Sequence, residues 1–449
     1  MRLIVISLLA LFASLILISV GNSFLVTLLG LRFSFQGIDP ADIGIVMVCY
    51  SAGFVIGALY AENVVRRVGH IRAFSVFAAS ASIAALMYPI ADSLLLWGAL
   101  RVVGGLSMAS LFIIIESWFS AVASNANRAK IFSLYQVAVY CASAVGQLLI
   151  GLGSPINQML LSFAAVLIMA AVIPLSLSRM HSPEIIESTR KIPLLKLLHI
   201  SPLGVVSAFI VGVFLGSFYA LVPLFATLTG LNSEQIAFYM FGAIMAAMLS
   251  AWPIGWICDR VQRSYVLLVV SLLAVVACSA NTFFLDDSFL WRLVSICACM
   301  GLASTIYPIA VAITNDLVDK SQVITASSGL MLSYALGSVL GPLVGSSLMQ
   351  SYGPGALFHT LSIALTFMVF YTLYRQYRMP PVPLDEQEEF VQTIPDVHVI
   401  SDIDPRNEEF IDTPIEDLFR EPTSDNGESD SEFTDIFPKN NNGLDESRC

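Results

Sequence analysis

Long apolar runs separated by short polar turns fill the chain up to about residue 378. A helix needs roughly 20 apolar residues to cross the hydrocarbon core of a bilayer, and in lipid every backbone polar group must be paired within its own segment. The pattern therefore predicts twelve membrane-spanning helices, and the first run is too long to be the core of a signal peptide. Their ranges are about 4–30, 41–61, 72–91, 94–120, 131–152, 156–178, 203–229, 235–257, 264–285, 288–315, 322–349 and 354–376.

The connection between the first two runs of each half repeats. Residues 36–47 read QGIDPADIGIVM, and residues 229–240 read TGLNSEQIAFYM. Each stretch opens with a Gly in a short polar turn and places an acidic or amide residue and Ile just before the next run. The repeat predicts an all-α membrane protein of two pseudo-symmetric six-helix bundles, the build of many secondary transporters, which hold their substrate between the two halves.

Composition supports a membrane protein. Apolar residues make up 57% of the chain and charged residues 12%, too few to cover a soluble protein of 449 residues. The net charge of −11 comes from the end of the chain, because residues 380–449 hold 20 acidic and 4 basic residues, and the rest holds 13 acidic and 18 basic residues. The acidic balance therefore says nothing about a substrate.

Charge along the chain predicts the orientation. Basic residues fall at alternate connections and at the end of the last run, whereas the opposite connections carry Arg32 and several acids. The positive-inside rule then places both termini in the cytoplasm of a multi-pass protein in the plasma membrane, here a bacterial inner membrane. The basic set includes Arg66, Arg67, Arg72, Arg128, Arg179, Arg190, Arg260, Arg263, Arg375 and Arg378, and the acidic set is Asp39, Asp42, Asp92, Glu234, Asp286 and Asp287.

Two polar stretches divide the chain. Residues 179–202 separate an N-terminal bundle (1–178) from a C-terminal bundle (203–378), and within this linker the segment IPLLKLLHI is suited to a short amphipathic helix at the cytoplasmic membrane surface. Residues 379–449 are acidic and rich in Ser, Asp, Asn and Pro, which predicts a disordered cytoplasmic tail. Two Glu-Glu-Phe segments in the tail leave open an alternative, a short motif that docks a cytosolic partner.

Several motifs resemble the major facilitator superfamily over residues 1–378. After the eighth run, Gly255 is followed by Asp259-Arg260 and by Arg263, similar to a loop motif of the family, whereas the first-half copy has Ala61-Glu62 at the acidic position. In the fourth run, Arg101-Val-Val-Gly-Gly resembles the membrane-embedded arginine motif of the family. The combination of Val-Gly-His-Ile-Arg after the second run with Glu-Ser-Trp closing the fourth is most similar to the YcaD-type subgroup, whose substrate is not settled.

The loop motifs predict a gate. Basic residues beside an acid can pair with it, and such pairs would lock the cytoplasmic mouth and break when it opens. The predicted gating residues are Glu116, Arg66, Arg67, Arg72, Asp259, Arg260 and Arg263.

A glycine-proline run marks the eleventh span. It is similar to the motif that drug antiporters of the family carry in span 5, but span 5 here has only Gly146-Gln147 without Pro, which argues against a drug antiporter. Glycine and proline allow both a hinge and close helix packing, and both interpretations stay open. The predicted hinge residues are Gly337, Gly341, Pro342 and Gly345.

Arg101 is the strongest candidate for a functional side chain. It lies nine residues past Asp92, about 13 Å along the helix, and a charge at that depth is costly enough to indicate a function. It could hold an anionic substrate group or regulate a proton-carrying acid; the alternative is an arginine satisfied by backbone carbonyls. Arg292, only five residues past Asp287, is within reach of the interface. Glu116 lies about 36 Å past Asp92, which favours a gate over a proton relay.

Glycines in the first and seventh runs predict interrupted helices there. Breaks at corresponding positions of two halves point to a transporter binding site. The residues that predict these breaks are Gly21-Asn22-Ser23 and Gly30 in the first run, and Gly212, Gly216 and Pro223 in the seventh. The predicted substrate and coupling residues are Arg101, Asn22, Gln147, Tyr140 and Tyr219.

The sequence has no nucleotide loop of the G-x-x-x-x-G-K-[ST] type, no metal-ligand cluster and no triad-like constellation. We therefore expect no enzyme, no cofactor or metal and no nucleic-acid partner. The prediction is a monomeric secondary active transporter that moves a small-molecule substrate across the lipid bilayer by alternating access, coupled to H+. The alternative is a transporter-like receptor or scaffold that acts through its tail.

Overall fold

The computed structural model describes residues 2–123, 128–177, 194–283, 288–318 and 323–378, with residues 382–384, 387, 390, 391 and 393 of the tail. The first half consists of α1 (Arg2–Phe35), α2 (Pro40–Val68), α3 (His70–Met87), α4 (Leu94–Val122), α5 (Arg128–Leu148), the 3-10 turn η1 (Leu149–Leu152), α6 (Gln158–Ala170) and α7 (Val172–Leu177). The second consists of α8 (Leu194–Ile200), α9 (Pro202–Leu228), α10 (Ser233–Cys258), α11 (Arg263–Phe283), α12 (Phe289–Ser304), α13 (Ile306–Asn315), α14 (Val323–Tyr352) and α15 (Ala356–Arg378).

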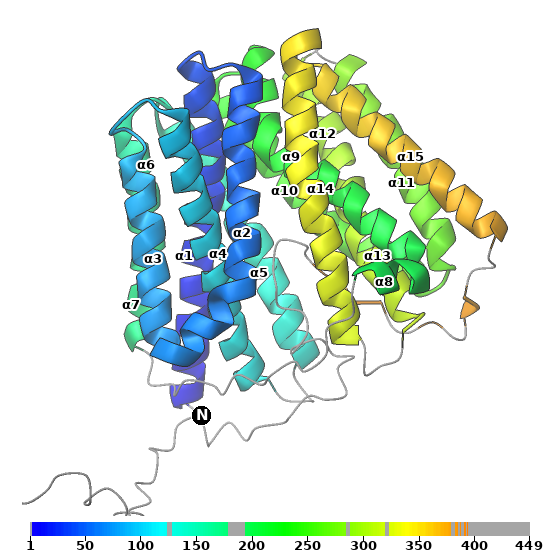
Figure 1. Cartoon of the computed structure of the whole chain (residues 1–449), viewed down its shortest axis with the longest axis horizontal. Helices are drawn as coiled ribbons and strands as arrows, with labels where there is room; N and C mark the ends of the chain where they lie inside the picture. Colours follow the sequence, from blue (N-terminus) through cyan, green and yellow to red (C-terminus); the bar gives the residue numbers. More distant parts are fainter. Residues whose placement is uncertain are drawn as a thin grey trace, which may run out of the picture.

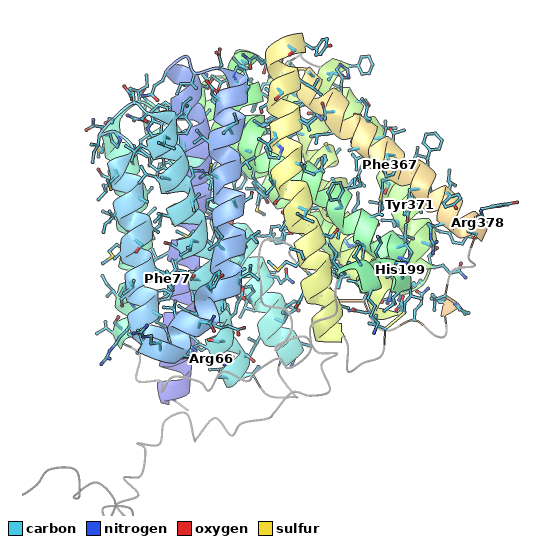
Figure 2. All side chains as sticks on the ribbon, in the orientation of Figure 1. Arg66, Phe77, His199, Phe367, Tyr371 and Arg378 are labelled. Atoms are coloured by element: carbon cyan, nitrogen blue, oxygen red, sulfur yellow. The ribbon has the colours of Figure 1, made fainter. Side chains whose placement is uncertain are left out.

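These helices form two bundles that stand side by side, α1–α7 in one and α9–α15 in the other (Figure 1). Within the described ranges, twelve segments are long and apolar enough to cross a membrane, which confirms the predicted fold class. Large apolar side chains face outward, among them Leu59, Trp252 and Phe367, the last on the outer side of α15 (Figure 2). So much exposed apolar surface is unsuited to water and suited to lipid.

The predicted interruptions of the first and seventh spans are wrong. α1 and α9 run without a break through Gly21 and Gly212, because one glycine costs a helix only about 1 kcal/mol and an open backbone in lipid costs more. The breaks lie instead at Ala171, between α6 and α7, and at Thr305, between α12 and α13. A proline lies four residues after the last residue of the preceding helix in both spans, and it lacks the N–H that the carbonyl of that residue would accept.

The duplicated connection folds the same way twice. Gly37 and Gly230 have φ of 74° and 83°, a left-handed conformation that glycine adopts without strain. Each turn leads into an N-cap position with extended backbone, at Asp39 and Asn232. Asn232 forms a full capping box, because its Oδ1 accepts from the Gln235 amide at 2.8 Å while the Gln235 side chain accepts from the Asn232 amide at 3.1 Å.

The two ends of the molecule differ in charge. One end, here called the basic end, carries the start of α1, the α2–α3 turn with Arg66 and the α10–α11 turn with Arg260 (Figures 1 and 2). The other, the acidic end, carries the α1–α2 turn with Asp39 and the α9–α10 turn with Glu234.

Most of the predicted linker 179–202 and of the predicted tail 379–449 lies outside the described residues. The amphipathic segment of the linker forms α8, whose Leu197 is fully buried. A Cβ at Gly329 of α14 would lie 2.6 Å from the Leu197 Cδ2 atom, so α8 packs directly on α14.

Candidate functional site

A small cavity of about 10 Å³, roughly the space that one water molecule needs, lies inside the first bundle. Its lining comes from α1, α2, α3 and α4 and is mostly apolar, with a few polar side chains. The polar members are Asn22, Tyr50, Tyr88 and Arg101.

Arg101 is the charged group of this cavity. Its side chain is 3% exposed, and its guanidinium carbon lies 4.6 Å from the centre of the Tyr50 ring. The Tyr50 hydroxyl in turn donates to Asn22 Oδ1 at 3.2 Å. Within the described chain, Arg101 Nε has no hydrogen-bond partner and no carboxylate lies within ion-pairing distance of the guanidinium. A buried cation without an anion nearby is unusual, which makes Arg101 the most conspicuous side chain of this cavity.

Glycines hold α2 against α4 and so place Arg101 over Tyr50. A Cβ at Gly53 would lie 2.1 Å from the Val102 carbonyl oxygen, and a Cβ at Gly105 would lie 2.0 Å from the Tyr50 carbonyl oxygen. No other residue fits at either position, because backbone would have to move. Gly104, which lines the cavity, has nothing within 4 Å of its Cβ position among the described residues.

The other predicted substrate residues lie at different places. Asn22 lines the cavity, whereas the Gln147 side chain donates to Ser23 Oγ at 2.5 Å and ties α5 to α1. Tyr140 is buried, and Tyr219 is half-buried with its ring 5.5 Å from that of Phe218.

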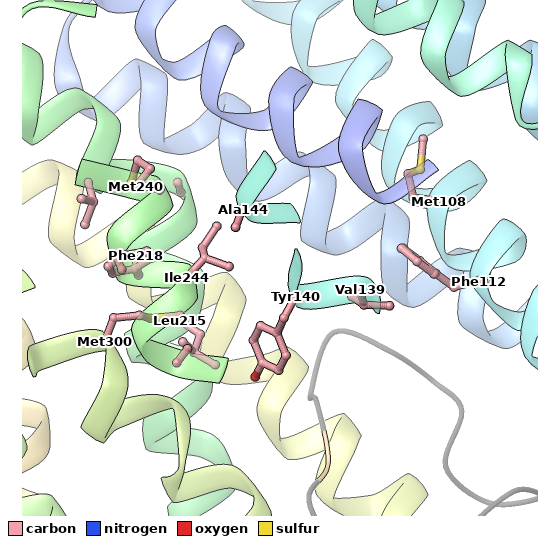
Figure 3. Close-up of a cluster of buried hydrophobic side chains, with 14 of the residues drawn as sticks. Met108, Phe112, Val139, Tyr140, Ala144, Leu215, Phe218, Met240, Ile244 and Met300 are labelled. Carbon is pink, nitrogen blue, oxygen red and sulfur yellow. The ribbon is translucent and has the colours of Figure 1, made fainter. Parts of the chain in front are cut away.

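The face of α5 that carries Tyr140 and Ala144 meets the second bundle. Figure 3 shows Ala144 next to Ile244 of α10, and Cys141 on α5 contacts Met248 on α10, with 3.7 Å between the sulfurs. Tyr140 therefore belongs to the surface between the bundles, while Arg101 and Asn22 belong to the cavity inside one bundle.

Further contacts between the bundles cluster toward the acidic end. A Cβ at Gly44 of α2 would lie 2.0 Å from Ser346 Oγ of α14. A Cβ at Gly151 of η1 would lie 3.9 Å from the Cα of Glu234 at the start of α10. From there the bundles spread toward the basic end (Figure 1). The structure is therefore closed at the acidic end.

Glu116 lies at the basic end of the first bundle, as its position along the helix predicted. It is 6% exposed, and Tyr135 Oη donates to its Oε1 at 2.9 Å. Arg66 pairs with Glu62 of its own helix at 3.6 Å, with both side chains largely in solvent, and Arg67 and Arg72 are exposed. A pair between Glu116 and one of these arginines stays a prediction.

The three charged residues of the loop motif in the second half each contact a different part of the protein. Arg263 forms a buried ion pair with Asp316 at the end of the tenth span, and its Nη1 also donates to the Ala312 carbonyl at 3.2 Å. Arg260 stacks on Trp256 with 4.0 Å to the ring centre. Asp259 Oδ1 accepts the Phe390 amide of the tail at 2.9 Å.

The glycine-proline run of α14 packs closely against α9. Cβ atoms at Gly337 and Gly341 would lie 2.1 and 2.3 Å from the carbonyl oxygens of Phe209 and Val213. α14 continues as one helix through Pro342. These contacts describe close packing, and a hinge at Gly337, Gly341, Pro342 and Gly345 stays a prediction.

Sequence reasoning missed Tyr50, Tyr88 and Asp316. The tyrosines carried no signal, because an aromatic residue in an apolar span usually serves packing. Asp316 did carry a sequence signal, because it lies at the end of the tenth span, the place that Glu116 has at the end of the fourth.

Known proteins match most of the chain. A profile described as Major Facilitator Superfamily matches residues 3–306 and 253–423. An uncharacterized MFS-type transporter of Enterobacter sp. (strain 638) is 28% identical over 382 residues, which cover 84% of this chain and 97% of that protein. The uncharacterized MFS-type transporter YcaD of Escherichia fergusonii is 29% identical over 384 residues, with 83% and 97% covered.

Solved structures share the fold at low sequence identity. The nucleoside transporter NupG, in a mutant form, has a TM-score of 0.69 at 13% identity and covers 82% of this chain and 99% of its own. A bacterial homologue of the human lysosomal transporter Spinster, inward-facing and occupied, has a TM-score of 0.66 at 15% identity, covering 85% and 97%. A D-xylose-proton symporter has a TM-score of 0.64 at 13% identity, covering 84% and 98%.

Proposed function

The chain belongs to the major facilitator superfamily, and we propose that it is a secondary active transporter, not an enzyme, that carries a small solute across a bacterial inner membrane by alternating access. The profile match and the similarity to YcaD confirm the resemblance that the motifs indicated.

The basic end faces the cytoplasm in this proposal. Arg66, Arg67, Arg260, Arg375 and Arg378 flank membrane spans at that end, and such residues are retained on the cytoplasmic side. Because the contacts between the bundles gather toward the acidic end, the structure then represents an inward-facing state. A reporter fused at position 190 tests the orientation, since a periplasmic reporter there would overturn it.

Arg101 is the observation that carries the proposal. The guanidinium is buried beside a cavity, bears a full charge and lacks a described anion. A carboxylate or phosphate of a substrate would satisfy both the charge and the donor geometry. We therefore place an anionic group of the substrate, or the coupling step that this group controls, at Arg101, with Asn22 and Tyr50 as neighbours.

Protons are the coupling ion in this proposal. Glu116 is a buried carboxyl at the cytoplasmic mouth that accepts a hydrogen bond from Tyr135, and buried acids in membrane spans commonly belong to proton relays. The D-xylose-proton symporter with the same fold gives a precedent for proton coupling. Glu116, Arg66, Arg67, Arg72, Asp259, Arg260 and Arg263 form the proposed gate.

The test starts with purified protein and a thermal-shift screen of metabolites and drugs that includes matched anionic and neutral pairs. Hits are then assayed for uptake into proteoliposomes with an imposed pH gradient, with Arg101→Met as the control. We expect anionic hits, uptake that follows the gradient and none in the variant. Uptake that is equal in the two proteins would contradict the role of Arg101, and binding without uptake would contradict transport.

A receptor or scaffold is the second candidate, because part of the tail contacts the α10–α11 turn. Removal of residues 380–449 separates the two functions. Solute uptake by the shortened chain supports a transporter, and a cellular phenotype that follows the tail without any solute supports a receptor.

A further inference from the structure

The α10–α11 turn holds a segment from the far end of the chain. The Phe390 amide donates to Asp259 Oδ1 at 2.9 Å, across 131 positions of sequence. A hydrogen bond to an ionised acceptor is stronger than one between neutral groups. Asp259 is itself exposed, so this contact uses an acceptor at the surface of the bundle.

A glycine makes room for the Phe390 ring. A Cβ at Gly255 would lie 3.0 and 3.1 Å from two carbons of this ring, and no other described atom would lie within 4 Å. Phe390 and Val391 pack against the apolar core, and Thr393 is 0% exposed. Upstream, Gln387 Nε2 donates to the Val382 carbonyl at 3.0 Å. Phe390, Val391 and Thr393 therefore lie against the bundle, whereas Leu384 further upstream is exposed; the described tail pieces are orange in Figure 1.

Charge favours the same contact. Around Phe390 the sequence places Asp385, Glu386, Glu388 and Glu389. The bundle presents Arg260, Arg375 and Arg378 at its basic end. The sequence around Phe390 is therefore opposite in charge to the arginines at the basic end of the bundle.

We propose that Phe390, with its described neighbours Val391 and Thr393, forms an intramolecular latch, which we call the tail latch, and that the surface formed by Gly255 and Asp259 is its docking site. The regulatory part of this inference rests on the proposed transport function. α10 packs on α5 of the other bundle at Met248, and Gly255 lies seven residues further, about 10 Å toward the basic end. Closure of that end has to bring this stretch of α10 toward the first bundle, so the docked latch holds the inward-facing state.

The tail contains a second copy of the sequence around Phe390, which could compete for the same docking site. Residues 408–413 read Glu-Glu-Phe-Ile-Asp-Thr, and residues 388–393 read Glu-Glu-Phe-Val-Gln-Thr, identical at four of six positions. The inference commits to Phe390 as the occupant, and Phe410 supplies a matched control.

Hydrogen exchange of the full chain in nanodiscs tests the docking. Phe390→Ala removes the ring that packs at Gly255 and so weakens docking of the residue-390 amide on Asp259. We expect it to raise exchange in residues 255–263 about tenfold, and Phe410→Ala to change nothing. Gly255→Ala should act like Phe390→Ala in the full chain and have no effect once residues 380–449 are removed. Unchanged exchange in both variants, or a change with Phe410→Ala alone, would overturn the latch.

Solute uptake then separates the latch from the transport function. With docking shown by exchange, Phe390→Ala and Gly255→Ala should both raise the uptake rate severalfold, because closure of the basic end no longer requires release of the tail. Docking without any uptake by any variant contradicts the transport function and leaves the docking site standing. Equal uptake in all variants contradicts inhibition by the latch.

Discussion

Arg101 has a poor energy balance in the empty protein. Insertion of an arginine at the centre of a membrane helix costs about 2.5–3.5 kcal/mol. The contact with the Tyr50 ring returns about 2 kcal/mol at best, and the unbonded Nε costs about 1–3 kcal/mol. A bound anion reverses this balance, which is the reason to connect Arg101 with the substrate.

This energy balance predicts that replacing Arg101 stabilises the empty protein but removes binding of an anionic solute. Arg101→Met should raise the free energy of unfolding of the empty protein by about 1 kcal/mol and abolish binding of an anionic solute, and Arg101→Lys should not restore it, because an ammonium lacks the planar donor fork. Thermal unfolding in detergent with and without solute measures both. Arg292→Met is the control, since Arg292 donates to the Thr229 carbonyl at 3.2 Å and its loss should destabilise. Equal destabilisation by both changes would make Arg101 a structural residue.

Substitution of Glu116 should affect transport differently from substitution of Arg101. In Glu116→Gln the side-chain oxygen still accepts from Tyr135, so packing is kept and only the charge is lost. We expect a changed balance between inward- and outward-facing states, which weakens apparent affinity by about twofold to tenfold while the site stays intact. Solute binding at saturation, by calorimetry, should therefore reach full stoichiometry. Complete loss of binding in Glu116→Gln, with normal binding in Arg101→Ala, would reverse the two roles.

Sequence identified part of the candidate site. Arg101 stood out because an isolated charge in an apolar run is costly wherever it points. Its neighbours Tyr50 and Tyr88 did not, because which face of a span turns inward depends on tertiary packing. The Arg263–Asp316 pair joins residues 53 positions apart, and no local pattern shows such a pairing.

At the scale of elements, two helices approach closely where a glycine carries only a hydrogen atom in place of a side chain. Gly105→Ala should destabilise the protein by about 1–3 kcal/mol, because its Cβ would lie 2.0 Å from a carbonyl of α2. Gly104→Ala is the neighbouring control and should be neutral or stabilising, since it meets nothing within 4 Å among described atoms and alanine favours the helix. Thermal unfolding compares the two. Equal effects would show that α2 and α4 are less tightly packed than the structure indicates.

Helices were easier to predict from sequence than their breaks. Hydropathy located all twelve spans, because lipid leaves a long apolar run no other fold. Glycines in the first and seventh spans suggested breaks, yet α1 and α9 are continuous and use Gly21 and Gly212 for close contacts with neighbouring helices. The observed breaks precede Pro174 and Pro308, but proline alone does not predict a break, because α9 and α14 continue through Pro223 and Pro342.

At the scale of the whole molecule, duplication preserved geometry more than chemistry. The turns at Gly37 and Gly230 have the same backbone conformation. At the basic end the halves differ, since Glu116 bonds to Tyr135 whereas Asp316 pairs with Arg263. The carboxyl at the end of the fourth span and the carboxyl at the end of the tenth span therefore contact different partners, although the turns that connect the halves are alike.

Alternating access requires the acidic end to open, and Gly44 lies at a close contact between the two bundles there. Its Cβ position lies 2.0 Å from Ser346 Oγ and 3.1 Å from the Pro342 carbonyl oxygen, across the boundary between the bundles. Gly44→Leu cannot fit unless α2 and α14 separate, so it should favour a state that is open at the acidic end. Ser346→Leu should do the same from the partner helix, and the exposed neighbour Ser347→Leu should not.

Spin labels at Phe35 and Tyr352, both exposed near the acidic end, measure this separation by pulsed electron resonance. We expect the distance between the labels to lengthen in Gly44→Leu and Ser346→Leu by several ångströms, while a folded, monodisperse protein is retained and net uptake is lost. Since α2 and α14 belong to different bundles, the change has to move one bundle against the other. A folded Gly44→Leu protein with an unchanged distance would mean that the α2–α14 contact yields locally and is not the moving boundary.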